Sequence, residues 1–184
     1  MTETASFPPV QAPLADPART VFFGIPLRAR ATAIDWSKTC RDFSRTLASI
    51  YNQSNPNFRI IVCCHDIPDL LIPTDQRLEF IKVHTPAPDL RADPKSIFPD
   101  KSRKMRKAIE RFHALGGGWL MILDADDLVS SRLVEFVSRS DNENGFLVRE
   151  GYLLDQDSRA CARIPNEHVF DHPFDQICGS CAVL

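Results

Sequence analysis

Short apolar runs alternate with amphipathic stretches along the first 130 residues of the chain. The runs TVFFGI, which ends at Pro26, and FRIIVCC are typical of β-strands, and LEFIKVH predicts a further strand with a more polar pattern. WLMIL, residues 119–123, is wholly apolar. This pattern predicts a strand that is buried on both faces, as in the middle of a parallel sheet.

Two stretches between these runs have the spacing of amphipathic helices. The first has Asp35 as a candidate N-cap and carries its apolar residues four and three apart, at Trp36, Cys40, Phe43, Leu47 and Ile50. The second is DKSRKMRKAIERFHALGGG, for which the pattern predicts a start capped by Asp100 or Ser102 and an end at Gly116. A shorter helix is expected around Leu133, followed by strand, turn and strand up to residue 164.

This order of elements predicts an α/β fold, with an open and mostly parallel sheet and helices on both faces. Ligands of such sheets bind at the carboxyl ends of the strands. Three segments follow strands and are therefore the places to look for a site, namely residues 26–30, 65–69 and 124–127.

Composition indicates one soluble domain without a membrane span. The 184 residues carry 22 basic and 24 acidic side chains, and this near-neutral balance argues against general nucleic-acid binding. No apolar run reaches the roughly 18 to 20 residues of a transmembrane segment, and the start lacks the features of a secretory signal, so a cytoplasmic location is expected. Four prolines predict a disordered lead-in over residues 1–19, with a single domain over 20–184.

Three acids directly follow the apolar run at residues 119–123. Asp124, Asp126 and Asp127 would repel one another at neutral pH unless a cation or solvent relieves them. Hard cations such as Mn²⁺ or Mg²⁺ prefer oxygen ligands and commonly share them with substrate phosphates. The alternative is that these acids cap a following helix and interact with its dipole.

The second predicted helix is basic from its start. Lys101, Arg103 and Lys104 are expected in its first turn, where backbone N–H groups favour anions. The alternative is an ordinary solvated basic face. Taken together, a metal centre and a basic helix start on one sheet predict a site for a nucleoside diphosphate.

At this point the chain resembles the family 2 glycosyltransferases of GT-A fold, which transfer sugars from nucleotide-diphosphate sugars. The resemblance covers residues 21–184 and rests on IPLRAR after the first strand, the strand-terminal Asp66, DKSRKMRKAIE and above all WLMILDADDLVS. It implies a metal-dependent transferase of the hexosyltransferase type that uses Mn²⁺ or Mg²⁺. The acceptor would be an unidentified glycan, lipid or protein.

The same resemblance implies roles for individual residues. Asp124 and Asp126 match the family's DXD motif, in which Asp124 would approach the ribose or metal and Asp126 would coordinate the metal. Asp66 would recognise the base, with Pro26 and Leu27 forming the wall beside it. Lys101 and Arg103 would lie near the sugar and the diphosphate.

The general base of an inverting family member has no counterpart in this sequence. It usually follows a Gly-rich strand that here resembles CGSCAVL, where the chain stops, so we expect a C-terminal truncation and leave the catalytic residue unassigned. Acids that could otherwise serve are Glu150, Asp155, Glu167, Asp171 and Asp175.

Other metal-ligating residues in the C-terminal part keep further alternatives open. In this family a late histidine is sometimes a third metal ligand, which makes His172 a candidate. Cys178 and Cys181 form a CxxC pair that could indicate zinc or redox chemistry, although no second pair accompanies it.

Two other functions compete with sugar transfer. ILDADD resembles the motif of phosphohydrolases that use an Asp nucleophile, but that motif normally opens its domain, and the expected Thr is replaced by Leu128. The chain could also be a nucleotide-sugar binding module without turnover.

Overall fold

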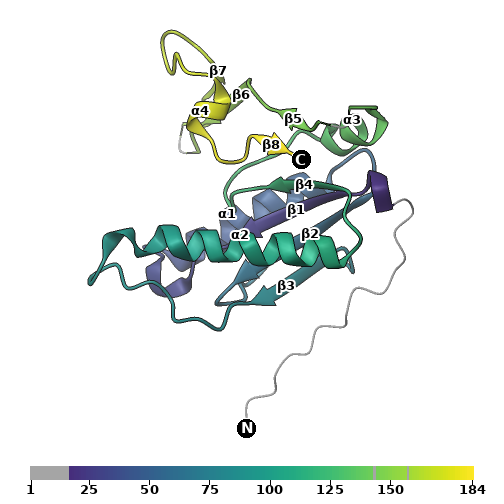
Figure 1. Ribbon diagram of the computed structural model, residues 1–184. Helices are drawn as coiled ribbons and strands as arrows, with labels where there is room; N and C mark the ends of the chain where they lie inside the picture. Colours follow the sequence, from purple (N-terminus) through teal and green to yellow (C-terminus); the bar gives the residue numbers. More distant parts are fainter. Residues whose placement is uncertain (1–16, 143, 157) are drawn as a thin grey trace.

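The computed structural model describes residues 17–142, 144–156 and 158–184 (Figure 1). Three short 3₁₀ turns are η1 (Pro17–Arg19), η2 (Arg30–Thr32) and η3 (Pro94–Ser96). The helices are α1 (Trp36–Tyr51), α2 (Ile97–Ala114), α3 (Leu133–Arg139) and α4 (Phe174–Ile177). The strands are β1 (Val21–Pro26), β2 (Phe58–Cys64), β3 (Leu78–Lys82), β4 (Trp119–Ile122), β5 (Phe146–Leu147), β6 (Gly151–Leu154), β7 (Cys161–Ile164) and β8 (Ala182–Val183).

Six of the strands form one sheet in the order β3-β2-β1-β4-β8-β5. β3, β2, β1 and β4 are parallel neighbours, whereas β8 runs antiparallel to both β4 and β5. β6 and β7 form a separate antiparallel hairpin that lies beyond the short strands of the sheet (Figure 1). The predicted α/β class with a mostly parallel sheet is therefore confirmed.

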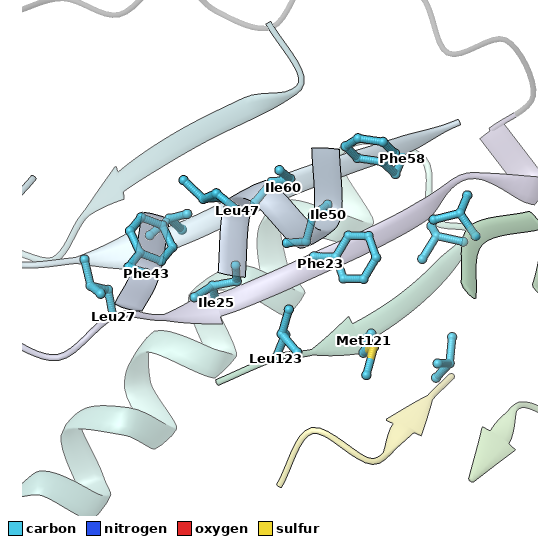
Figure 2. Close-up of a cluster of buried hydrophobic side chains, with 14 of the residues drawn as sticks. Phe23, Ile25, Leu27, Phe43, Leu47, Ile50, Phe58, Ile60, Met121 and Leu123 are labelled. Carbon is cyan, nitrogen blue, oxygen red and sulfur yellow. The ribbon is translucent and has the colours of Figure 1, made fainter. Parts of the chain in front are cut away.

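One face of the sheet is covered by α1. Phe43, Leu47 and Ile50 of this helix are fully buried and belong to the same cluster as Phe23 and Ile25 of β1 (Figure 2). The predicted stripe forms because these helix residues recur every three or four positions. Asp35 caps the helix as expected, since its side chain accepts a hydrogen bond from the Lys38 amide.

α2 covers the opposite face. Its Ala108 and Phe112 pack with alternate residues of β1 and β2, and the rings of Phe22 and Phe112 meet edge to face at 5.2 Å. Gly24 allows this approach, because a Cβ built there would lie 3.2 Å from the Ala108 Cβ and 2.9 Å from the Ile122 Cδ1. Helices thus lie on both faces of the sheet, as predicted.

α2 begins earlier than the sequence pattern predicts. Its first residue is Ile97 after the N-cap Ser96, so neither Asp100 nor Ser102 caps it. Pro99 falls in the first turn, where a residue without an N–H leaves no intrahelical bond unmade. As a result, Lys101 and Arg103 lie in the second turn, and the predicted basic start of the helix is wrong.

The described ends of the chain also differ from expectation. Residues 1–16 of the predicted disordered lead-in lie outside the described residues, but 17–19 form η1, in which Arg19 donates to the Ser138 carbonyl at 2.6 Å. Within residues 145–164, expected as strand, turn and strand, β6 and β7 form such a hairpin, but Phe146–Leu147 form the separate strand β5 in the main sheet. Across the described residues, no helix has both the length and the apolar character needed to cross a bilayer.

β4 is less buried than its wholly apolar sequence predicts. Met121 is buried, but the other three residues of the strand are only half-buried. The cause is the short neighbour on one side, since the two-residue β8 pairs with β4 at Met121 and Val183, next to a pair of backbone hydrogen bonds between Leu120 and Leu184. Leu123, immediately after the strand, is fully buried and anchors the segment that follows.

The packing of α1 gives a direct test of this fold. Replacing the fully buried Leu47 by Ala should lower the free energy of unfolding by about 2 to 5 kcal/mol, because it removes transfer energy and leaves a cavity. Urea unfolding would measure the change. Leu71→Ala, at a residue that is 66% exposed, is the matched control and should cost less than about 0.5 kcal/mol. Equal effects would contradict the packing described.

Candidate functional site

The three acids after β4 form a tight turn at the carboxyl edge of the sheet. The amide of Asp127 donates to the Asp124 carbonyl at 3.2 Å, which closes the turn around Asp126. Thr46 of α1 donates its hydroxyl to the Ala125 carbonyl at 3.0 Å. The turn is therefore fixed both by its own backbone and by the helix behind it.

Asp124 is held by two other parts of the chain. Its Oδ1 pairs with the Nζ of Lys101 at 2.6 Å, and its amide donates to the Oγ of Ser180 at 2.8 Å. Both charged side chains are partly open to solvent, with 41% of Lys101 and 29% of Asp124 exposed. Gly179 packs against the pair, since a Cβ there would lie 3.5 Å from the Asp124 Oδ2.

Asp126 and Asp127 lie in an acidic environment. Desolvation raises the pKa of the Asp126 carboxyl above its usual value, and repulsion from Asp127, Asp124 and Asp42 raises it further. Cys178 donates its thiol to the Asp127 Oδ2 at 3.2 Å. Burial, together with the neighbouring Asp127, raises the pKa of the Cys178 thiol to about 11, so this thiol stays protonated.

A buried ionic cluster fixes α2 beside these acids. The Nζ of Lys104, only 1% exposed, donates to the Leu27 carbonyl at 2.8 Å and to the Asp100 Oδ2 at 2.6 Å. The other carboxylate oxygen of Asp100 lies 2.9 Å from the Nε2 of His65. Burial opposes ionisation of Asp100, but the bonds to Lys104 and His65 outweigh it and hold the pKa of this carboxyl below its usual value.

These elements enclose a cleft of about 540 Å³ at the carboxyl edge of the sheet. Its volume lies within the usual range for small-molecule sites. It is lined by the end of β1, the start of α1, the first two turns of α2 and the acidic turn, through Pro26, Leu27, Arg28, Ile34, Asp35, Lys38, Thr39, Asp42, Ile97, Asp100, Lys101, Lys104, Asp124, Ala125 and Asp126.

A second, largely apolar cavity of about 800 Å³ lies on the other side of Asp126. It shares Asp42 and Asp126 with the first cleft and extends beneath the β6–β7 hairpin. Arg45 of α1 donates to the side chain of Gln156 at 2.7 Å and so links the helix to the hairpin turn. Apolar residues that line it include Met121, Leu123, Leu128, Val129, Leu133, Tyr152, Leu153, Leu154 and Phe174.

The structure brings five of the seven expected site residues into the first cleft. Pro26, Leu27, Lys101, Asp124 and Asp126 all line it, although they come from three separate parts of the sequence. Leu27 is fully buried, so it contributes to the wall mainly through backbone and packing.

The other two expected residues lie outside this lining. Asp66, at the end of β2, accepts a hydrogen bond from the Arg30 amide at 2.9 Å and so holds η2 in place. Arg103 is exposed on α2, and its Nε donates back to the Pro99 carbonyl of the same helix at 3.2 Å. A basic residue in the second turn of a helix can point away from the cleft that its neighbour Lys101 enters.

The candidates for a general base are scattered over the C-terminal part. Of the five acids, Glu150 alone lines the second cavity, where it is paired with Arg163. Asp175 lies 3.8 Å from the Nε of Arg149, and the remaining three are exposed. His172, the candidate third metal ligand, is exposed in the segment before α4.

Three residues of the site were not expected from the sequence. Ser180 holds the Asp124 amide, Asp42 borders both cavities, and Lys38 pairs with Asp42 at 2.5 Å. The four-residue spacing of Lys38 and Asp42 on a helix was a visible signal for their pairing. Ser180 had no local signal, because it reaches β4 only through the pairing of β8.

The acids fit a divalent cation in chemistry but not in number. Their carboxylate oxygens are the ligands that Mn²⁺ and Mg²⁺ accept, and a bound cation would relieve the repulsion that raises the pKa of Asp126. Within the described parts of the chain, no group of three or more His, Cys, Asp or Glu side chains could hold a metal ion. An ion held by Asp124 and Asp126 alone would have to take its remaining ligands from elsewhere, such as water or a bound phosphate group.

Comparisons with known proteins do not assign this chain to a family. No protein-family model matches this chain, and no curated protein matches it. The resemblance to a sugar-transferring family accordingly rests on the sequence motifs alone.

The buried cluster on α2 predicts a large cost for losing Lys104. Lys104→Met should lower the free energy of unfolding by about 3 to 5 kcal/mol, because Asp100 would stay buried without its main counter-charge. In the wild type, the stability that Asp100 contributes at neutral pH should be lost as the pH falls through its lowered pKa. Urea unfolding at several pH values measures both effects.

Lys101→Met is the matched control for this cluster, because its ion pair is partly exposed, and it should cost less than about 1 kcal/mol. If Lys104→Met lowers the free energy of unfolding as little as Lys101→Met does, the cluster does not hold α2 in place.

The raised pKa of Asp126 predicts that its charge destabilises the metal-free protein. With EDTA at neutral pH, Asp126→Asn should raise the melting temperature by roughly 1 to 3 °C, because it removes repulsion from the neighbouring acids. The gain should shrink as the pH falls through the raised pKa of Asp126, below which the wild-type side chain is also neutral. Differential scanning fluorimetry across pH measures this difference in melting temperature. A gain that does not change with pH, or a lower melting temperature for Asp126→Asn, would contradict the electrostatic account.

Proposed function

We propose that this chain is a GT-A-type glycosyltransferase domain, related to family 2, that transfers a sugar from a nucleotide-diphosphate sugar to an acceptor hydroxyl with the help of Mn²⁺ or Mg²⁺. The observation that carries the proposal is the meeting of Asp124, Asp126 and Lys101 in one cleft with the end of β1. Acids and a partly exposed lysine at the carboxyl edge of a parallel sheet suit a metal-bound diphosphate.

Different residues around the cleft would bind different parts of the donor. Pro26 and the backbone of the buried Leu27 would form the wall beside the base, whereas Asp66 lies outside the cleft lining and holds η2. Asp124 and Asp126 would hold the cation, and Lys101 would contact the diphosphate from α2. Arg28, exposed at the same cleft, offers a second cationic group for the phosphates.

Sugar transfer leaves a nucleoside diphosphate, whose negative charge must be stabilised as the glycosidic bond breaks. Lys101 would donate hydrogen bonds to that leaving group from α2, which is held by the buried Lys104–Asp100 pair. The divalent cation, when bound, supplies the rest of the neutralising charge.

The apolar cavity behind Asp126 favours transfer over phosphate hydrolysis. An enzyme that transfers a sugar needs a second compartment for the acceptor, and this cavity meets the donor cleft at Asp42 and Asp126. Hydrolysis of a phosphate ester requires only water as the acceptor. A phosphohydrolase should therefore release p-nitrophenol from p-nitrophenyl phosphate, whereas a transferase should release nucleotide from nucleotide sugars.

Binding of nucleoside diphosphates tests the proposal. UDP or GDP with Mn²⁺, at about 100 times the dissociation constant, should stabilise the protein by about 2.7 kcal/mol and raise the melting temperature by roughly 5 to 10 °C. Asp126→Ala should remove the metal-dependent part of this shift. Asp141→Ala, at an exposed acid outside the cleft, should leave it unchanged. The proposal is wrong if neither nucleotide shifts the melting temperature with or without Mn²⁺.

A further inference from the structure

One ion pair in the cleft joins a residue proposed to bind metal to one proposed to bind diphosphate. The Lys101 Nζ lies 2.6 Å from the Asp124 Oδ1, which is the distance of a strong charge-assisted hydrogen bond. A metal ligand and a phosphate ligand thus neutralise each other before either meets its own partner. The two binding events are coupled through this contact.

The pair is built so that only one side chain needs to move. The turn that carries Asp124 is held by the bond from the Asp124 amide to Ser180, while the backbone next to Lys101 is held by the Asp100–Lys104 pair. The side chain of Lys101 is 41% exposed and has a flexible four-carbon stem, so it can leave Asp124 without disturbing the helix.

A free divalent cation competes with the ammonium of Lys101 for Asp124. At the Asp124 Oδ1 it must displace the ammonium of Lys101, and at either oxygen of this carboxylate it remains close to that positive charge. Asp126 and Asp127 attract the cation, but they do not give Lys101 a new partner. A diphosphate does, because its oxygens can accept hydrogen bonds from Lys101 once the metal has taken its place at Asp124.

We propose that Lys101 takes the place of the divalent cation at Asp124 until the donor binds, so that the cleft binds the metal–diphosphate complex in preference to the free ion. This inference rests on the proposed function and adds to it the form in which the ligand enters. Lys101 is a specificity-determining residue on this account, because it sets the coupling between metal and diphosphate.

Binding of Mn²⁺ alone gives a test that needs neither nucleotide nor turnover. The free Mn²⁺ signal in electron paramagnetic resonance measures how much ion each variant binds. Lys101→Gln should bind Mn²⁺ about tenfold more tightly than the wild type, a difference of about 1.4 kcal/mol. Arg106→Gln removes one positive charge from an exposed position on the same helix and is the matched control for net charge. It should stay within about twofold of the wild type.

Isothermal titration with UDP then completes the cycle. Lys101→Gln should bind metal-free UDP about tenfold more weakly than the wild type, and added Mn²⁺ should enhance its UDP binding less than it does in the wild type. Unchanged or weaker Mn²⁺ binding by Lys101→Gln, or tightening equal to that of Arg106→Gln, would overturn the inference. Absence of UDP binding to the wild type, with tighter Mn²⁺ binding by Lys101→Gln, would reject the proposed function but retain the role of Lys101.

Discussion

The buried bond between Lys104 and Asp100 is the contact on which the geometry of the site depends. Lys104 also donates to the Leu27 carbonyl, so one ammonium joins α2 to the end of β1, while Asp100 extends the connection to His65 after β2. Charges as buried as these are stable only when fully paired. The cluster therefore sets how far α2 projects beyond the sheet, and with it the position of Lys101 opposite Asp124.

The acidic turn is the opposite case, because its charges are close together and only partly compensated. Lys101 and Ser180 hold Asp124, and Cys178 donates to Asp127, but the Asp126 carboxyl is left with a raised pKa. One fully paired cluster and one turn with mutually repelling charges thus line the same cleft. Such a contrast suits a site in which a fixed scaffold presents charges that a ligand will neutralise.

Hydrophobic periodicity predicted the central strands and α1 because these elements bury regular stripes, and it also placed Asp124 and Asp126 at a strand end. It predicted the start of α2 at Asp100 or Ser102 and not at Ile97, although Pro99 in the first turn of the helix breaks no hydrogen bond. Lys104 could not be distinguished from its exposed basic neighbours, since its burial depends on Leu27, 77 residues away. Ser180 reaches Asp124 only through the pairing of β8 with β4, which no local pattern encodes.

The central claim is that a divalent cation and a diphosphate meet between the acidic turn and α2. Paramagnetic broadening by Mn²⁺ in the amide NMR spectrum, with UDP present, locates the ion directly. The account predicts that the amide signals of Ala125, Asp126 and Gly179 broaden at the lowest Mn²⁺ concentrations. Broadening that begins instead around His168 and His172, or that is the same with and without UDP, would contradict it.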